Sequence, residues 1–248
     1  MRCELDHIVI GAATLADGVR FIRETLGVEI PPGGRHPLMS THNHLMQLSI
    51  IAKSGLPVFA KNDAQTKSLS RSFVGLPTQT CLGGGAFLEV ISIDPDAPPP
   101  SRPRWYALDA PAMRARLAEG PGVIAWVVRS PDIVATAHAA TYPVGEVIAA
   151  RRDALSWRLT IPADGHIPSD GVLPHVIEWD DGARPWERMT DLGCRLETLV
   201  ISHPDPASVE SQLRSIGADD IAGVEVKTGA MPGLGLRVVT PSGRVATL

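Results

Sequence analysis

The chain has 248 residues, of which 44% are hydrophobic and 20% are charged, and its net charge at pH 7 is −4. These values exclude a fully disordered chain and give no basic surface that would favour a nucleic-acid partner. No apolar run approaches the roughly 18–20 residues that span a bilayer, and the run at 8–10 is too short for the core of a signal peptide. We expect a cytoplasmic globular protein that contacts neither nucleic acid nor membrane.

The first third of the chain predicts the element order βαβββ. A β-branched apolar strand is expected at 5–11, followed by a helix that begins after Thr14 and ends before Gly27. Three further strands are expected at 28–30, 41–48 and 86–94.

Residues 49–85 interrupt this first unit before its last strand. The segment is rich in Lys, Ser, Thr and Gln, and its one acidic residue is Asp63. Because a structureless loop of about 30 residues is unusual inside a compact domain, we interpret the segment as an insertion at the tip of a hairpin.

The same order of elements recurs twice, which indicates an internal repeat. The recurring elements are a strand at 122–128, a helix at 132–140, strands at 145–151, 156–161 and 172–179, a strand at 196–202, a helix at 206–216, and strands at 224–228, 234–240 and 245–248. The predicted divisions are a first unit at 1–95, a proline-rich linker with a short helix at 96–120, a second unit at 121–180 and a third unit at 194–248.

Six segments carry a family resemblance: LDHIVIGA (5–12), HPLMSTHNHLMQL (36–48), FLEVISIDPDAPPPSRPRWYALD (87–109), WRLTIPADG (157–165), VLPHVIEW (172–179) and DLGCRLETLVISHPDP (191–206). Together they resemble a glyoxalase-like domain protein of the vicinal oxygen chelate superfamily, and the run at 87–109 is the most specific part. The resemblance implies an α+β fold in which repeated βαβββ modules form curled mixed sheets around a cup-shaped site.

The sequence departs from the family pattern in two ways. The insertion stands where the family has a short turn, and the third unit makes the number of modules odd. We expect the first two units to pair, with the third packed on an edge or against another subunit. Because an unpaired unit leaves open sheet edges, a homodimer is a further expectation.

The resemblance implies a divalent metal held by a first-strand histidine, a mid-module histidine and a last-strand glutamate, here His7, His42 and Glu89. Two imidazoles and one carboxylate match a known arrangement that leaves metal positions open for substrate. Glu89 stands in an apolar strand, where an unpaired carboxylate is costly. The alternative is a core histidine, His7, that is hydrogen-bonded to Glu89.

Two other histidines are candidates for contacts with substrate. His44 competes with His42, because alternate residues of a strand point to one face, and the family pattern favours His42. His175 could approach the site from the facing sheet, although a surface or internally satisfied histidine is the more common case.

These features predict a glyoxalase-like, metal-dependent enzyme that acts on a small organic molecule with chelating oxygens. The metal would be iron, zinc, nickel or manganese, and the reaction would be that of an isomerase, a lyase or a dioxygenase, with Glu89 also catalytic. The alternative is a metal-free protein of the same fold that binds and sequesters a small molecule. Convergence of His7, His42 and Glu89 discriminates between the two.

Overall fold

The computed structural model describes residues 2–50, 85–180 and 183–248. Most of the predicted insertion at 49–85, including Asp63, lies outside the described residues. Within the described part of the chain, no helix has the length and apolar character needed to cross a membrane.

The first unit has the predicted order of elements. They are β1 (Glu4–Gly11), α1 (Leu15–Leu26), β2 (Pro32–His36), β3 (Thr41–Ile50) and β4 (Ala86–Ile93). The Thr14 hydroxyl caps α1 by accepting a hydrogen bond from the Asp17 amide, and Gly27 ends the helix with a φ of 73°. The strand predicted at 28–30 is wrong. The second strand starts at Pro32 instead, which an edge strand tolerates as its first residue because β2 pairs on one side only, with β3.

The second unit follows a linker that contains a 3₁₀ turn, η1 (Trp105–Ala107), and the short helix α2 (Pro111–Glu119). Its elements are β5 (Gly122–Arg129), α3 (Ile133–Ala139), β6 (Glu146–Arg152), β7 (Leu155–Ile161), the 3₁₀ turn η2 (Pro168–Gly171) and β8 (His175–Trp179). These bounds confirm the strands and the helix expected between residues 122 and 179.

The third unit follows another 3₁₀ turn, η4 (Pro185–Arg188). Its elements are β9 (Arg195–His203), α4 (Pro206–Ser215), β10 (Val224–Thr228), β11 (Gly233–Val239) and β12 (Val245–Thr247). Parallel pairing of β9 with the end of β3, at Ser49 and Ile50, places this unit on the edge of the first.

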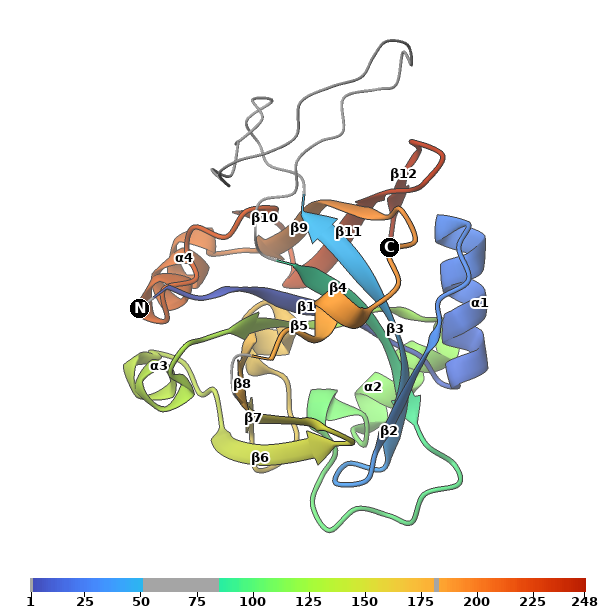
Figure 1. Cartoon of the computed structure of the whole chain (residues 1–248). Coiled ribbons are helices and arrows are strands. Elements are labelled where there is room, and N and C mark those ends of the chain that lie inside the picture. Colours follow the sequence, from blue (N-terminus) through green and yellow to red (C-terminus); the bar gives the residue numbers. More distant parts are fainter. Residues whose placement is uncertain (1, 51–84, 181–182) are drawn as a thin grey trace, which may run out of the picture.

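All three units share one mixed sheet, whereas the family resemblance implies curled mixed sheets built from paired units. The strand order is β12-β11-β9-β3-β4-β1-β5-β8-β7-β6, and β10 and β2 pair with β9 and β3 off this path. Antiparallel pairing of β1 with β5 joins the first unit to the second. The sheet curls so far that β6, at its end, contacts β2 (Figure 1). The homodimer was expected because an unpaired unit leaves open sheet edges, and it stays a prediction.

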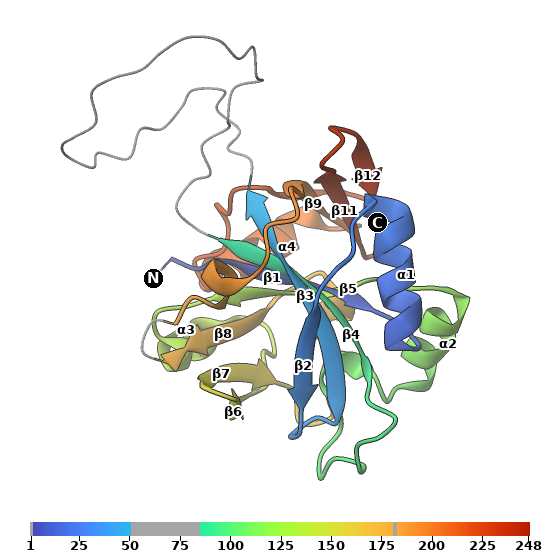
Figure 2. The same cartoon turned by 45° about the vertical axis from the view of Figure 1, so that its right-hand side comes forward.

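The curled sheet has a different apolar cluster on each face. On the outer face α1 packs against β3 and β4 (Figure 2), where Ile22 and Leu26 join Leu88 and Val90. On the inner face, strands of the first two units and the linker bury Val9, Ile91 and three aromatic residues. Because strand side chains alternate between faces, β1 and β4 each contribute to both clusters.

Candidate functional site

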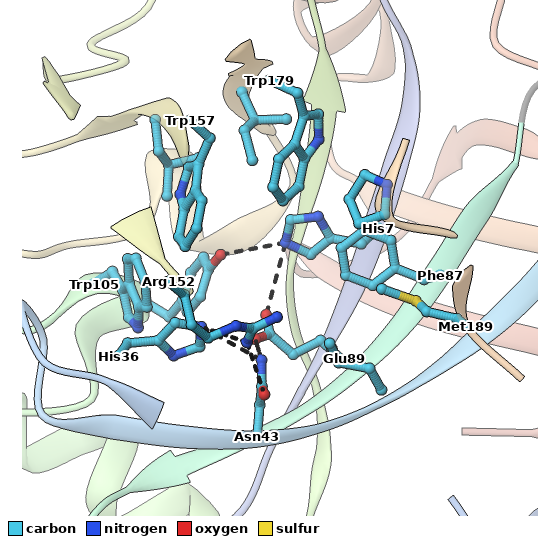
Figure 3. A pocket seen from close by; sticks show the side chains of 15 residues that line it. His7, His36, Asn43, Phe87, Glu89, Trp105, Arg152, Trp157, Trp179 and Met189 are labelled. Carbon is cyan, nitrogen blue, oxygen red and sulfur yellow. Dashed lines mark hydrogen bonds and ion pairs between the residues drawn. The ribbon is translucent and has the colours of Figure 1, made fainter. Parts of the chain in front are cut away.

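A cavity of about 40 Å³ lies on the inner face, between the first and second units (Figure 3). This volume is room for about three water molecules. The residues that line it are His7, His36, Asn43, Leu45, Phe87, Glu89, Trp105, Tyr106, Arg152, Trp157, Leu159, Ile177, Trp179, Pro185 and Met189. The polar strand residues among them come mainly from β1, β3 and β4, whereas β7 and β8 present apolar and aromatic side chains.

A bulge in β1 places two consecutive polar residues at the site. In the pairing of β1 with β5, Leu5 lies opposite Val128 and His7 opposite Val127, so Asp6 is an extra residue. The His7 Nδ1 donates to Asp6 Oδ1 at 2.6 Å, and Asp6 Oδ2 accepts from an indole N–H at 2.9 Å. The fully buried Asp6 therefore orients the His7 ring. Sequence reasoning missed Asp6, although an acid beside a histidine in an apolar strand was a signal.

Glu89 lies on the same side of the cavity as His7. Its Oε1 accepts a hydrogen bond from Asn43 Nδ2 at 2.6 Å. Its Oε2 is 3.7 Å from His7 Nε2, which is an ion-pair distance if the ring is protonated. The His7 ring also stacks on Phe87, with 4.5 Å between ring centroids. One Glu89 oxygen is thus held in place, and the other faces the space beside His7 (Figure 3).

The linker supplies a third polar group, the hydroxyl of Tyr106. This hydroxyl lies 3.5 Å from His7 Nε2. Burial raises the Tyr106 pKa well above its usual value, and the Glu89 and Asp6 carboxylates raise it further, so the phenol stays protonated. Tyr106 and Ala107 both have left-handed backbones, with φ of 57° and 55°. Such strain at a cavity wall is typical of residues that a site holds in place.

A second polar cluster lies on the other side of the cavity. Arg152 Nη1 lies 3.3 Å from both His36 Nε2 and Asn43 Oδ1, to which it donates. Because His36 Nε2 accepts, its proton lies on Nδ1, which is 3.1 Å from the Thr41 hydroxyl. Burial, with a smaller contribution from the Arg152 charge, lowers the His36 pKa to about 3, so the ring is neutral.

His42 and His44 lie on the other face of β3, contrary to our prediction. In the pairing with β4, His42 is opposite Ser92 and His44 opposite Val90, whereas Leu45 is opposite Glu89. His42 Nε2 is 2.8 Å from the Ser92 hydroxyl, and His44 Nδ1 donates to the Ile30 carbonyl at 2.7 Å. The intervening Asn43 is the residue that reaches Glu89, so the position that we expected His42 to occupy lies one residue further along β3.

His175 lies behind the cavity wall rather than in it. Its Nδ1 donates to the Thr160 carbonyl at 2.9 Å, and its ring meets the Tyr106 ring edge-on, with 5.3 Å between centroids. Its Nε2 has no hydrogen-bond partner among the described residues. Burial lowers the His175 pKa to about 4, so this histidine supports Tyr106 as a neutral ring.

The predicted metal ligands do not converge. His7 Nε2 and Glu89 Oε2 face one space, but His42 is on the far side of the strand, and the residue in its place is an amide whose Oδ1 accepts from Gly34 and Arg152. Among the described residues, no three His, Cys, Asp or Glu side chains form a group that could hold a metal ion. The donor set therefore does not fit the three-residue metal site that we predicted.

The sequence matches the model of one protein family, described as a glyoxalase-like domain. The match covers residues 5–50 and 78–217, about three quarters of the chain. Both sides of the cavity fall within the matched residues. No curated protein matches the sequence.

Several solved structures are similar to this structure. A hypothetical protein from Staphylococcus aureus has a TM-score of 0.55 at 12% identity, over 100% of this chain and 98% of its own. A Streptomyces coelicolor methylmalonyl-CoA epimerase variant with bound 2-nitronate-propionyl-CoA has a TM-score of 0.40 at 17% identity, over 75% and 100%. The Mycobacterium tuberculosis methylmalonyl-CoA epimerase has a TM-score of 0.35 at 13% identity, over 71% and 85%. The first of these similarities concerns the fold alone.

Proposed function

The chain belongs to the glyoxalase-like domain family, and from this premise we propose that it is an enzyme that moves a proton on a small organic substrate. One observation carries the proposal: Glu89, His7 and Tyr106 converge in a small cavity walled by aromatic side chains. Because these three side chains are buried, their electrostatic interactions with a bound molecule would be stronger than in water. The proposed reaction class is that of an isomerase or a lyase.

Glu89 is the proposed base. The hydrogen bond from Asn43 fixes Oε1 and leaves Oε2 beyond hydrogen-bond distance of His7, so Oε2 can accept a proton from a substrate. The protonated Tyr106 hydroxyl is the proposed donor to a substrate oxygen. His7, which Asp6 orients, presents Nε2 to the same space.

The proposed step begins at a carbon next to a carbonyl group. Glu89 Oε2 takes the proton, and the electron pair of the broken C–H bond forms the C=C bond of an enolate. The negative charge develops on the former carbonyl oxygen, to which Tyr106 donates. In a substrate with a hydroxyl group on the reacting carbon, transfer of a proton between the two oxygens and return of the Glu89 proton to the former carbonyl carbon complete an isomerisation. Departure of a leaving group from the next carbon, with its bonding electron pair, completes a lyase reaction instead.

Exchange of hydrogen for deuterium tests this step without knowledge of the natural substrate. Pyruvate, pyruvamide, acetone and dihydroxyacetone would be incubated in D₂O with the protein, and loss of C–H signal would be followed by proton NMR. We expect faster exchange than in buffer for at least one compound. Glu89→Gln removes the base but keeps the acceptor for Asn43, so exchange should fall by about 10²–10⁴-fold. Glu146→Gln, on the exposed edge strand, is the matched control and should behave as wild type.

No exchange above the buffer rate for any of the four compounds would contradict the proposed enzyme. The same compounds would then be tested for binding by tryptophan fluorescence, because three tryptophans line the cavity. Binding without exchange would favour the alternative, a protein that sequesters a small molecule in this fold.

A further inference from the structure

Arg152 stands apart from the other charged residues of the cavity. It is the last residue of β6, and it reaches across to β2 and β3 of the first unit. Its described partners, His36 Nε2 and Asn43 Oδ1, are both neutral. No ion pair of Arg152 is found within the described ranges, whereas Arg158, in the next strand, pairs with Glu178. No described residue therefore neutralises the Arg152 charge.

The neutrality of His36 follows from its surroundings. The ring is 7% exposed and packs edge-on against Trp105, with 5.0 Å between centroids. It accepts from the guanidinium through Nε2 and does not add a second positive charge. Arg152 Nη1 is thus positioned by acceptors, while Nη2 and Nε have no hydrogen bond to a described residue. A guanidinium held in this way offers a fork that matches a carboxylate.

Two glycines in β2 make room for this arrangement. A side chain at Gly34 would place its Cβ 2.8 Å from Arg152 Cδ and 3.2 Å from Nε. A side chain at Gly33 would clash with Asn43 Oδ1. The Gly34 amide also donates to Asn43 Oδ1 at 2.8 Å. The glycine pair therefore lets Arg152 lie against β2 while Asn43 spans the distance to Glu89.

Arg152 also stands where the cavity meets the surface. Leu45, Arg152, Pro185 and Met189 line both the cavity and an outer groove of about 230 Å³. A molecule entering from the groove would meet the guanidinium before it reaches Glu89. The inner space, about 40 Å³, has room for only a few heavy atoms beyond that point.

We propose that Arg152 is the residue that selects the substrate, by binding the carboxylate of a short oxo acid whose carbonyl end enters the cavity. This inference deepens the proposed function and rests on it for the identity of the reacting carbon. The carboxylate lies at the mouth, on the Nη2 and Nε side of the guanidinium. The carbonyl oxygen reaches the Tyr106 hydroxyl, and the adjacent C–H lies beside Glu89 Oε2.

A matched pair of probes tests the proposal. Pyruvate and pyruvamide have nearly the same shape, but only pyruvate carries a carboxylate. Tryptophan fluorescence titrations should show at least 10-fold tighter binding of pyruvate by the wild type, and Arg152→Gln should abolish that preference. Arg151→Gln changes the neighbouring exposed arginine and should keep it. Circular dichroism would confirm that each variant is folded.

Gly34→Ala provides a second variant that leaves the guanidinium present. Its Cβ should displace the Arg152 side chain and weaken pyruvate binding, with no effect on the binding of pyruvamide. Equal binding of the two probes by the wild type, or wild-type binding of pyruvate by Arg152→Gln, would overturn the proposal.

The outcome separates the two proposals. Exchange of pyruvamide that depends on Glu89, together with no preference for pyruvate, would leave the proposed function standing and remove the role of Arg152. An Arg152-dependent preference for pyruvate without any exchange would remove the proposed reaction and leave an anion-binding cavity.

Discussion

The two sides of the cavity differ in kind. The first unit contributes hydrogen-bonded polar groups, and the second contributes a wall of large apolar side chains with one arginine at its end. The polar set is Asp6, His7, Asn43 and Glu89, and the wall is Trp157, Leu159, Ile177 and Trp179. Directly across the seam between the units, His7 faces Val127 in the paired strand. Two units of similar topology thus differ in what they present to the cavity, with mostly polar groups from one and mostly apolar groups from the other.

The largest stability effect should come from the apolar wall. Leu159 is 2% exposed, so Leu159→Ala should lower the free energy of unfolding by about 2–5 kcal/mol in urea titrations. Val134→Ala, at a side chain that is 56% exposed, is the control and should stay within about 0.5 kcal/mol of wild type. If Glu89→Gln destabilised the protein more than Leu159→Ala, the apolar wall would not be the side of the cavity that contributes most to stability.

Each side also holds one neutral histidine, and pH should reveal both. The pKa of His36 is lowered to about 3 and that of His175 to about 4, both mainly by burial. The unfolded chain takes up protons near pH 6.5, while the folded chain resists them. Stability should therefore be full above pH 6.5 and fall as the pH drops toward 4, by roughly 1 kcal/mol per histidine per pH unit.

Urea unfolding at pH 7.5, 6 and 5 measures this slope. His36→Gln and His175→Gln should each make it shallower, whereas His166→Gln, at an exposed site, should leave it unchanged. An identical slope in all four proteins would show that neither buried ring stays neutral in the folded state.

Divalent metals should have the smallest effect. Because only His7 and Glu89 of the predicted ligands converge, we expect no saturable rise in melting temperature on titration with Zn²⁺, Ni²⁺, Mn²⁺ or Fe²⁺. A rise that disappears in Glu89→Gln would contradict this expectation and restore the metal site that the sequence predicted.

Most strands and helices were predictable from local pattern. The β-branched runs that became β1, β4 and β5 are apolar enough to be buried on both faces, and the caps of α1 need only Thr14 and Gly27. The family resemblance supplied the curl of the sheet. The strands and caps depend on residues that are close together in the sequence, so one sequence is enough to predict them.

The site was harder to predict because it depends on register and on distant pairing. His42 and Asn43 are adjacent, and a shift of one residue exchanges which of them faces Glu89. Asp6 reaches the site only through a bulge that local pattern does not show. Arg152 arrives from the second unit, 109 residues beyond Asn43. Of the predicted site residues, His7 and Glu89 line the cavity. The sequence could indicate these two because a polar residue stands out in an apolar strand, whichever strand it pairs with.

The left-handed backbone at Tyr106 and Ala107 affects how this protein can be stabilised. Each such residue raises the energy of the folded chain by about 1–3 kcal/mol, and glycine relieves the strain because it has no Cβ. At Tyr106 the same substitution would remove the hydroxyl beside His7. At Tyr106, therefore, the substitution that would raise thermal stability is also the one that would take a hydroxyl group out of the cavity.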